Sequence, residues 1–160
     1  MGQASLEAVV LFLDGSGIRH VYPHGLETVR AAWDPDLDPG ESIADAIAAL
    51  GVSPVMVHST SWRVVGREIV LTFLVVVEPP TDLPDSYDVE VVTRAELARG
   101  HARGGPTEVH LSQVVEHGLR HLSWLVREDD AIHAALADWS HALASYEGEP
   151  FRAFGREPGS

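Results

Sequence analysis

The stretch of the sequence with the clearest chemical potential is an acidic loop that reads WDPDLDPGES. Asp34, Asp36, Asp38 and the later Asp45 have the alternating spacing of the oxygen ligands in an EF-hand-like calcium loop. Such a loop needs a glycine turn at its sixth position, but that residue is Pro39, whose φ is locked negative. We therefore expect a solvated loop whose carboxylates favour the N-terminal end of the next helix, rather than a calcium site.

Nine histidines in a chain without cysteine suggest a second kind of site. In the segment EHGLRHLSWL, His117 and His121 are four residues apart, so a helix would present both rings on one face to a metal ion. Two ligands do not complete a site, and the candidates for a third are Glu116, Asp130, His133 and His141. The alternatives are histidines packed inside a helical hairpin, or a homodimer contact through the face that carries Val114, His117, His121 and Trp124.

A polar patch, HSTSWR, ends a predicted strand, and its hydroxyl groups, imidazole and guanidinium are suited to a phosphate or carboxylate. The sequence has no Ser-His-Asp order and no Walker or dinucleotide fingerprint, so the patch is not predicted to be catalytic. We predict a ligand-binding pocket that contains Arg30, Glu41, His58, Ser61 and Arg63. The alternatives are an ordinary hairpin edge, or an enzyme that uses a carboxylate and histidine set consisting of Glu41, Asp45, His58 and His117.

The elements that must position these groups begin with a β-hairpin, because strand-like residues 6–13 and 18–22 flank a turn with two glycines, Asp14-Gly15-Ser16-Gly17. Apolar spacing predicts a short helix over residues 26–33 and a second over 43–50, with Ser42 as its N-cap and Gly51 at its end. SPVMVHSTSW and REIVLTFLVVV are predicted strands. In REIVLTFLVVV, the side chains that would point to either face of the strand are mostly apolar. We therefore expect a central strand with helices on each side.

The last third of the sequence is predicted to be helical. A short strand and a short helix capped by Thr93 follow the proline-rich loop EPPTDLPDSYD. Apolar periodicity then predicts a helix over about residues 108–127 and a second one after Asp129 or Asp130, which together form a helical hairpin. We predict a single domain over residues 1–160, made of a sheet part (6–97), the helical hairpin (108–146) and a tail (147–160).

Composition limits the classes of partner. The formal net charge of −13 disfavours nucleic acid and anionic membrane surfaces, because both would be repelled. The absence of cysteine excludes disulfides and thiolate metal sites, and no apolar stretch is long enough for a signal peptide or a spanning helix. We therefore expect a cytoplasmic protein that binds neither nucleic acid nor membrane, and the sequence names no cofactor.

The order of these segments resembles the Nudix hydrolase fold over residues 6–97. The resemblance rests on the hairpin VVLFLDGSGIRHVYP, the loop with PGES, the helix ending in LGV and the strands VMVHSTSW and IVLTFLVVV. It implies an α/β/α sandwich of the α+β class, with a mixed sheet. In that family, a Gly-Glu loop leads into a helix with Arg-Glu-x-x-Glu-Glu, whose carboxylates hold the divalent cation that activates water on a diphosphate.

This chain departs from the catalytic part of that pattern. Gly40-Glu41 and Gly51-Val52 match its two ends, but the segment between them is shorter than in the family and lacks its carboxylates. Only Glu41 and Asp45 remain as ligand candidates. The resemblance implies a Nudix-like binding or interaction module without hydrolase activity, which binds a small phosphorylated ligand or a second copy. The alternatives are a metal-dependent hydrolase with a noncanonical site and an unrelated α+β fold with a similar strand order.

Overall fold

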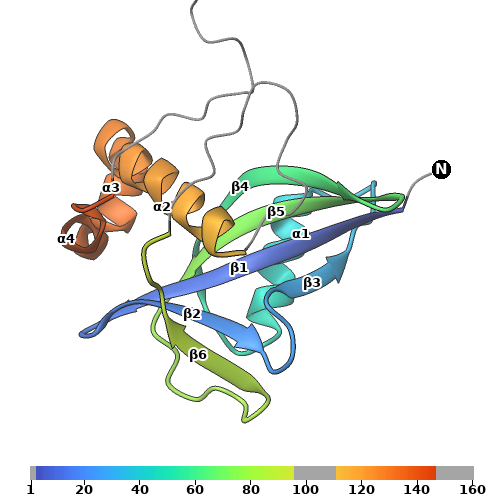
Figure 1. Cartoon of the computed structure of the whole chain (residues 1–160), viewed down its shortest axis with the longest axis horizontal. Helices are drawn as coiled ribbons and strands as arrows, with labels where there is room; N and C mark the ends of the chain where they lie inside the picture. The colour runs from blue at the N-terminus through green and yellow to red at the C-terminus, as the bar shows by residue number, and fades with distance from the viewer. Residues whose placement is uncertain (1–2, 96–110, 147–160) are drawn as a thin grey trace, which may run out of the picture. The chain divides into compact units, whose positions relative to one another are not determined.

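The computed structural model of the chain describes residues 3–95 and 111–146 and consists of two compact units, Met1–Arg94 and Ala95–Ser160. The first unit contains the sheet and one helix, and the second contains the remaining helices (Figure 1). The class is α+β, as the sequence predicts. The single domain predicted from the sequence stays a prediction.

The sheet unit is built on one mixed sheet. Its strands are β1 (Ala4–Asp14), β2 (Gly17–Pro23), β3 (Val29–Ala32), β4 (Pro54–Val65), β5 (Glu68–Val77) and β6 (Tyr87–Val91). They follow the order β4-β5-β1-β2-β6, and β3 pairs with β1 beside this path. The pairing of β1 with β5 is parallel and all other pairings are antiparallel. Strand β1 is therefore flanked by β5 along one side and by β3 and then β2 along the other.

The predicted hairpin between β1 and β2 is confirmed. Asp14 is paired with Gly17, and the Ser16 amide donates to the Asp14 carboxylate at 2.7 Å. Gly17 has a φ of 115°, a value that residues with a Cβ rarely adopt. The local turn residues are sufficient to specify this element.

The predicted helix over residues 26–33 is wrong, because this segment forms strand β3. Val29 and Ala31 pack into the core while Arg30 between them points to the opposite face, which is the alternation of a strand. Backbone pairing with β1 outweighs the helical spacing of the apolar residues, and Leu26, the first residue of that pattern, is exposed. As part of β3, Arg30 lies directly across from Glu7 of β1.

Helix α1 (Pro39–Ala48) begins earlier than predicted and has a different cap. Asp38, not Ser42, is the N-cap, and its carboxylate accepts a hydrogen bond from the Glu41 amide at 3.0 Å. Pro39 does not exclude a helix here, since it occupies the first helical position, where its missing N–H costs nothing. At the other end, the helix stops at Ala48, two residues before the predicted end, and Gly51, with a φ of 80°, lies in the turn that follows.

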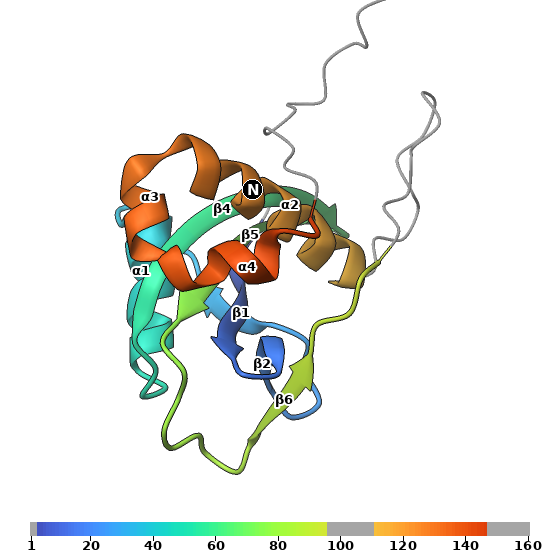
Figure 2. The ribbon, with the colours of Figure 1, turned by 90° about the vertical axis from the view of Figure 1, so that its left-hand side faces the viewer.

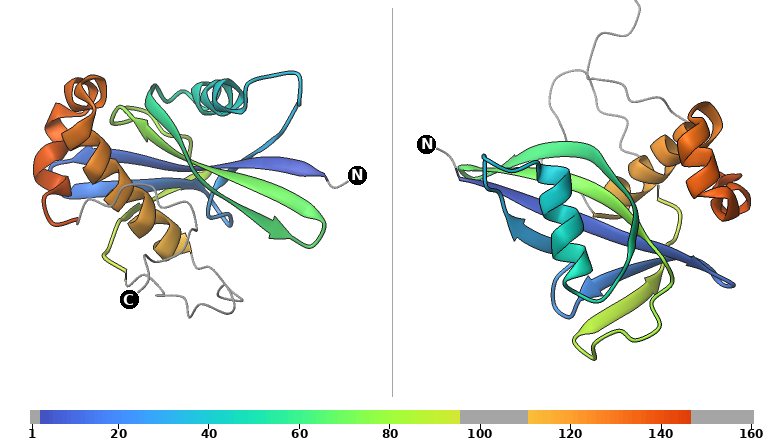
Figure 3. Two further views of the ribbon diagram at one scale, coloured as in Figure 1. Left: turned by 90° about the horizontal axis from the view of Figure 1, so that it is seen from above. Right: turned by 180° about the vertical axis from the view of Figure 1, so that it is seen from behind.

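Helix α1 packs on one face of the sheet (Figure 3). Its Ile43 and Ile47 are completely buried in one apolar cluster with alternate residues of β1 and β5. The sheet residues of this cluster include Leu6, Ala8, Val10, Phe12, Val21, Val29, Phe73, Val75 and Val77. Strand β5 is interior to the sheet, between β4 and β1, and its other alternating residues, such as Val70 and Val76, are buried too.

The helical unit consists of α2 (Leu111–Glu128), α3 (Asp130–Ala135), a single 3₁₀ turn, η1 (Ala137–Trp139), and α4 (Ser140–Leu143). Asp129 caps α3 as predicted, because its carboxylate accepts from the amides of the next turn. The predicted second helix is not continuous, since Leu136 leaves the helical conformation. The short helices still contact α2 as a hairpin (Figure 2). The predicted helix after Thr93 falls largely outside the described residues.

Among the described residues, no helix combines the length and the apolar character that a membrane crossing requires.

Candidate functional site

A buried carboxylate lies in the middle of the sheet. Glu7 sits on β1 between Leu6 and Ala8, which both face α1, so the alternation of the strand directs Glu7 to the opposite face. The pairing register places Glu7 directly across from Thr72 on β5 and from Arg30 on β3. Glu7 is only 1% exposed, and a buried charge of this kind requires partners.

Four side chains supply those partners. Arg63 of β4 approaches with both terminal nitrogens, its Nη1 bonding to Oε1 and its Nη2 to Oε2, the latter at 2.9 Å. The hydroxyls of Thr72 and Thr28 donate to the carboxylate at 2.6 and 3.2 Å. Arg30 Nη2 lies 3.4 Å from Glu7 Oε2, and Arg63 also donates to the Thr72 hydroxyl at 3.2 Å. We call Glu7, Thr28, Arg30, Arg63 and Thr72 the Glu7 cluster.

The cluster keeps Glu7 ionised. Burial alone would raise the pKa of Glu7, but hydrogen bonds from Arg63 and Thr72 and the positive charges of Arg63 and Arg30 together hold that pKa below its ordinary value. Because both carboxylate oxygens already accept hydrogen bonds, Glu7 is poorly suited to take a proton or bind a metal ion. Its evident effect is to orient two guanidinium groups.

The two arginines retain free binding capacity. The Arg30 side chain is 47% exposed and meets Glu7 with one nitrogen, and the Arg63 side chain is 35% exposed. Arg30 also borders a shallow hollow of about 310 Å³, lined by residues 3–5, residues 30–32 and Glu68. Ser5 is one of the lining residues, and its hydroxyl is itself buried and has no hydrogen-bond partner among the described residues. Guanidinium and hydroxyl donors are the groups that bind phosphate and carboxylate.

The structure brings together part of the ligand pocket predicted from the sequence. Arg30 and Arg63 meet at Glu7, and the register places Ser61 opposite Thr72 on the same face. His58, opposite Leu74, lies further along this face of β4. Glu41 does not join them, because α1 carries it on the other side of the sheet. Ligand binding by any of these residues stays a prediction.

The aspartates of the acidic loop shape the local backbone. Asp34 accepts a hydrogen bond from the Asp36 amide at 2.9 Å, and Asp38 caps α1. Both side chains are exposed. Within residues 3–95 and 111–146, no three His, Asp or Glu side chains are grouped closely enough to hold a metal ion. These contacts account for the carboxylates of the loop as structural groups.

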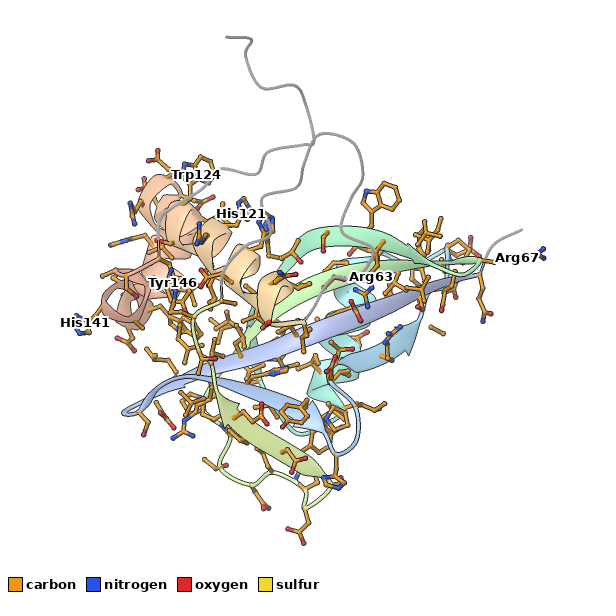
Figure 4. All side chains as sticks on the ribbon, viewed as in Figure 1. Arg63, Arg67, His121, Trp124, His141 and Tyr146 are labelled. Carbon is orange, nitrogen blue, oxygen red and sulfur yellow. The ribbon has the colours of Figure 1, made fainter. Side chains whose placement is uncertain are left out.

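The two predicted metal ligands on α2 have different surroundings. His121 is buried, and its ring stacks on Trp124 with the centroids 6.0 Å apart and the planes 19° apart (Figure 4). His117 is half-buried one turn earlier. One candidate third ligand, Glu116, accepts from Arg120 at 2.9 Å and from the Ala95 amide at 3.1 Å. Metal binding at His117 and His121, and dimerisation through their helix face, remain predictions.

Reasoning from the sequence missed Glu7, Thr28 and Thr72. One signal was available, since Glu7 is the only charged residue between Ala4 and Leu13, a stretch that otherwise reads as a buried strand. A carboxylate in such a strand needs a cationic partner. The identity of that partner depends on strand pairing, which the sequence does not display.

Comparison with known proteins gives matches in structure only. No protein-family model matches the sequence, and no curated protein matches it at a significant level. An Ap4A hydrolase from C. elegans has 12% identity and a TM-score of 0.42, covering 56% of this chain and 80% of that chain. The ORF135 protein of E. coli has 11% identity and a TM-score of 0.39, with 56% and 73% covered.

A proposed nudix hydrolase family member from Chromobacterium violaceum has 10% identity and a TM-score of 0.49, covering 88% of this chain and 93% of that chain. The description of this last neighbour names the same family that the sequence resembles.

Proposed function

We propose that this chain is a binding module that holds a small phosphorylated ligand with Arg30 and Arg63 and does not hydrolyse it. The observation that carries the proposal is the geometry of the Glu7 cluster. One buried carboxylate fixes two arginines from separate strands on the same face of the sheet. Two guanidinium groups meet one carboxylate within the cluster, while Glu68 lines the hollow beside Arg30.

Preorganisation supports this role. The bidentate contact with Glu7 limits the orientations of Arg63, so less side-chain freedom is lost when an anion binds. Arg30 is less constrained and lies beside the hollow that Ser5 also lines. A phosphate bound at Arg30 would have room for an attached group in that hollow.

The arrangement gives less support to the alternative of a noncanonical hydrolase. That alternative requires Glu41, Asp45 and His58 to act together on one reacting group. Glu41 and Asp45 are on α1, whereas His58 faces the opposite side of the sheet. In addition, the buried residues of α1 are Ile43 and Ile47, so this helix does not present the row of carboxylates that a Nudix metal site needs.

The proposal is tested by thermal unfolding of the full chain with inorganic diphosphate, nucleoside diphosphates and sugar phosphates. A ligand at 100 times its Kd stabilises the folded state by about 2.7 kcal/mol, which gives a measurable rise in Tm. We expect this rise in the native protein, a much smaller rise in Arg30→Ala, and an unchanged rise in Arg67→Ala. Arg67 is a matched control because it is an exposed arginine at the turn between β4 and β5 (Figure 4).

A flat response of the native protein to every phosphorylated compound would contradict the proposal. An equal loss in the Arg30 and Arg67 variants would show that binding depends only on general charge. Incubation of the same compounds with Mg²⁺ or Mn²⁺ tests the hydrolase alternative, and release of phosphate that is abolished by Glu41→Gln would establish it.

A further inference from the structure

The two outer strands of the sheet differ in how they meet solvent. Strand β4 has 12 residues, and among the described residues it pairs with β5 alone, so that its other backbone edge has no strand partner there. Four of the nine exposed large apolar side chains among the described residues lie at the turn end of the β4–β5 hairpin, where Trp62 is 67% exposed and Val64 is 60% exposed. The register pairs Trp62 with Leu71 and Val64 with Ile69, so Trp62, Val64 and the exposed Ile69 share one face.

The opposite edge carries the usual protection against pairing. Strand β6 is only five residues long and contains Asp88 and Glu90. Short length and charged side chains are the devices by which proteins prevent an outer strand from pairing with another chain. The end of β4 beyond Ser61 has neither an acidic residue nor a lysine. The pairing of β4 with β5 has register shifts between Pro54 and Met56 and between Ser59 and Ser61, and it is regular after the second.

Charge identifies what can approach this edge. The chain contains 24 acidic residues, yet residues 46–67 contain none, and the charged residues within that stretch are Arg63 and Arg67. Two copies of a chain with a formal net charge of −13 repel one another over most surfaces. The β4 edges can meet without bringing carboxylates together, and each copy supplies the same unpaired strand, as a two-fold contact requires.

We propose that the chain forms a homodimer in which residues 61–65 of β4 pair antiparallel with the same residues of a second copy. The pairing would satisfy backbone groups that have no strand partner among the described residues, and would place Trp62 of each copy across from Val64 of the other. The two Arg63 side chains would lie opposite one another on the other face, each paired with the Glu7 carboxylate of its own copy. This surface is separate from the face of α2 that the sequence suggests for a dimer. The Trp62 and Val64 face is opposite to the face of the proposed ligand, but the two proposals share the strand segment that carries Arg63.

The test is sedimentation of the full chain across a micromolar concentration range, comparing the native protein with Val64→Lys and Val91→Lys. Val91 is a matched control, since it is an exposed valine on the other outer strand, β6. We expect the native protein to approach twice its 17.3 kDa mass with rising concentration. Val64→Lys should raise the dimer Kd by about tenfold or more, because the edge then carries a lysine in each copy, while Val91→Lys should leave it unchanged.

Hydrogen exchange provides the second readout. The amides of residues 61–65 should exchange more slowly as the native protein is concentrated, and this protection should be absent from Val64→Lys. Circular dichroism of both variants checks that they remain folded. A native protein that stays at 17.3 kDa overturns the proposal. A dimer that Val64→Lys leaves intact but Trp124→Lys dissociates also overturns it, and would place the contact on α2 instead.

Discussion

The acidic loop and the Glu7 cluster use carboxylates in opposite ways. In the loop, Asp34 and Asp38 are exposed and accept hydrogen bonds from backbone amides two and three residues away. Glu7 is buried and accepts from side chains that are 21, 56 and 65 residues distant along the sequence. The run of aspartates thus determines local backbone shape, whereas the isolated glutamate pairs with Arg30 and Arg63, the residues proposed to bind a ligand.

The largest effect should follow from separating Glu7 from its bidentate partner. Arg63→Met keeps much of the side-chain bulk but leaves a buried carboxylate with Arg30 as its remaining cation. We expect the free energy of unfolding to fall by about 3 kcal/mol, the lower end of the cost of breaking a buried ion pair, because Arg63 is partly exposed. Urea unfolding measures the change.

Arg67→Met is the control for this prediction and should change the free energy of unfolding by less than about 0.5 kcal/mol. Equal losses in the two variants would mean that Glu7 does not depend on Arg63, and the contrast between the cluster and the loop would no longer hold.

The pH dependence of stability should carry the signature of Glu7. Its folded pKa lies below the ordinary value of 4.5, so the unfolded chain binds the proton more readily. The stabilisation is therefore fully present above about pH 4.5 and is lost as the pH falls through the folded pKa. The difference in unfolding free energy between the native protein and Glu7→Gln should be constant above this range and shrink below it.

A second group makes Glu7→Gln a necessary comparison. Burial lowers the pKa of His20, so acid also destabilises the native protein below the ordinary histidine value of 6.5. Both proteins retain His20, and its contribution cancels in their difference. If the difference between them did not vary down to the lowest pH at which both remain folded, the proposed ionisation of Glu7 would be contradicted.

Within the acidic loop, the predicted effects are smaller and local. Asp38→Ala removes the N-cap of α1 and should lower the free energy of unfolding by about 1 kcal/mol. Asp36→Ala, in the same loop and also exposed, removes the same charge without removing the cap, so its effect should be close to zero. Equal effects of the two substitutions in urea unfolding would assign the contribution to general charge rather than to the cap.

The smallest expected effect is that of divalent cations on the loop. Because the carboxylates of Asp34 and Asp38 accept hydrogen bonds from backbone amides, millimolar Ca²⁺ or Mg²⁺ should leave the Tm of the full chain unchanged. A rise in Tm that disappears in Asp34→Asn would show that the loop binds a metal ion after all, and would revive the calcium interpretation of the aspartate spacing.

Sequence reasoning was accurate where neighbouring residues determine the structure. The turn at Gly17, the left-handed glycine at position 51 after α1 and the cap at Asp129 are all specified by nearby residues. It failed at β3, where pairing with β1 decides the conformation, and at Leu136, where the predicted helix is interrupted. The Glu7 cluster could not be predicted for the same reason, because Arg30 and Arg63 are brought together only by the pairing register of four strands.

The most direct test of ligand binding at the Glu7 cluster is NMR observation of the arginine side-chain Nε–H groups during titration with inorganic diphosphate. Arg30→Lys, Arg63→Lys and Arg67→Lys assign the three resonances. The account predicts saturable shifts for Arg30 and Arg63, with little change for Arg67 at the hairpin tip. Shifts of equal size in all three, or none at Arg30, would contradict the claim that this cluster is the binding site.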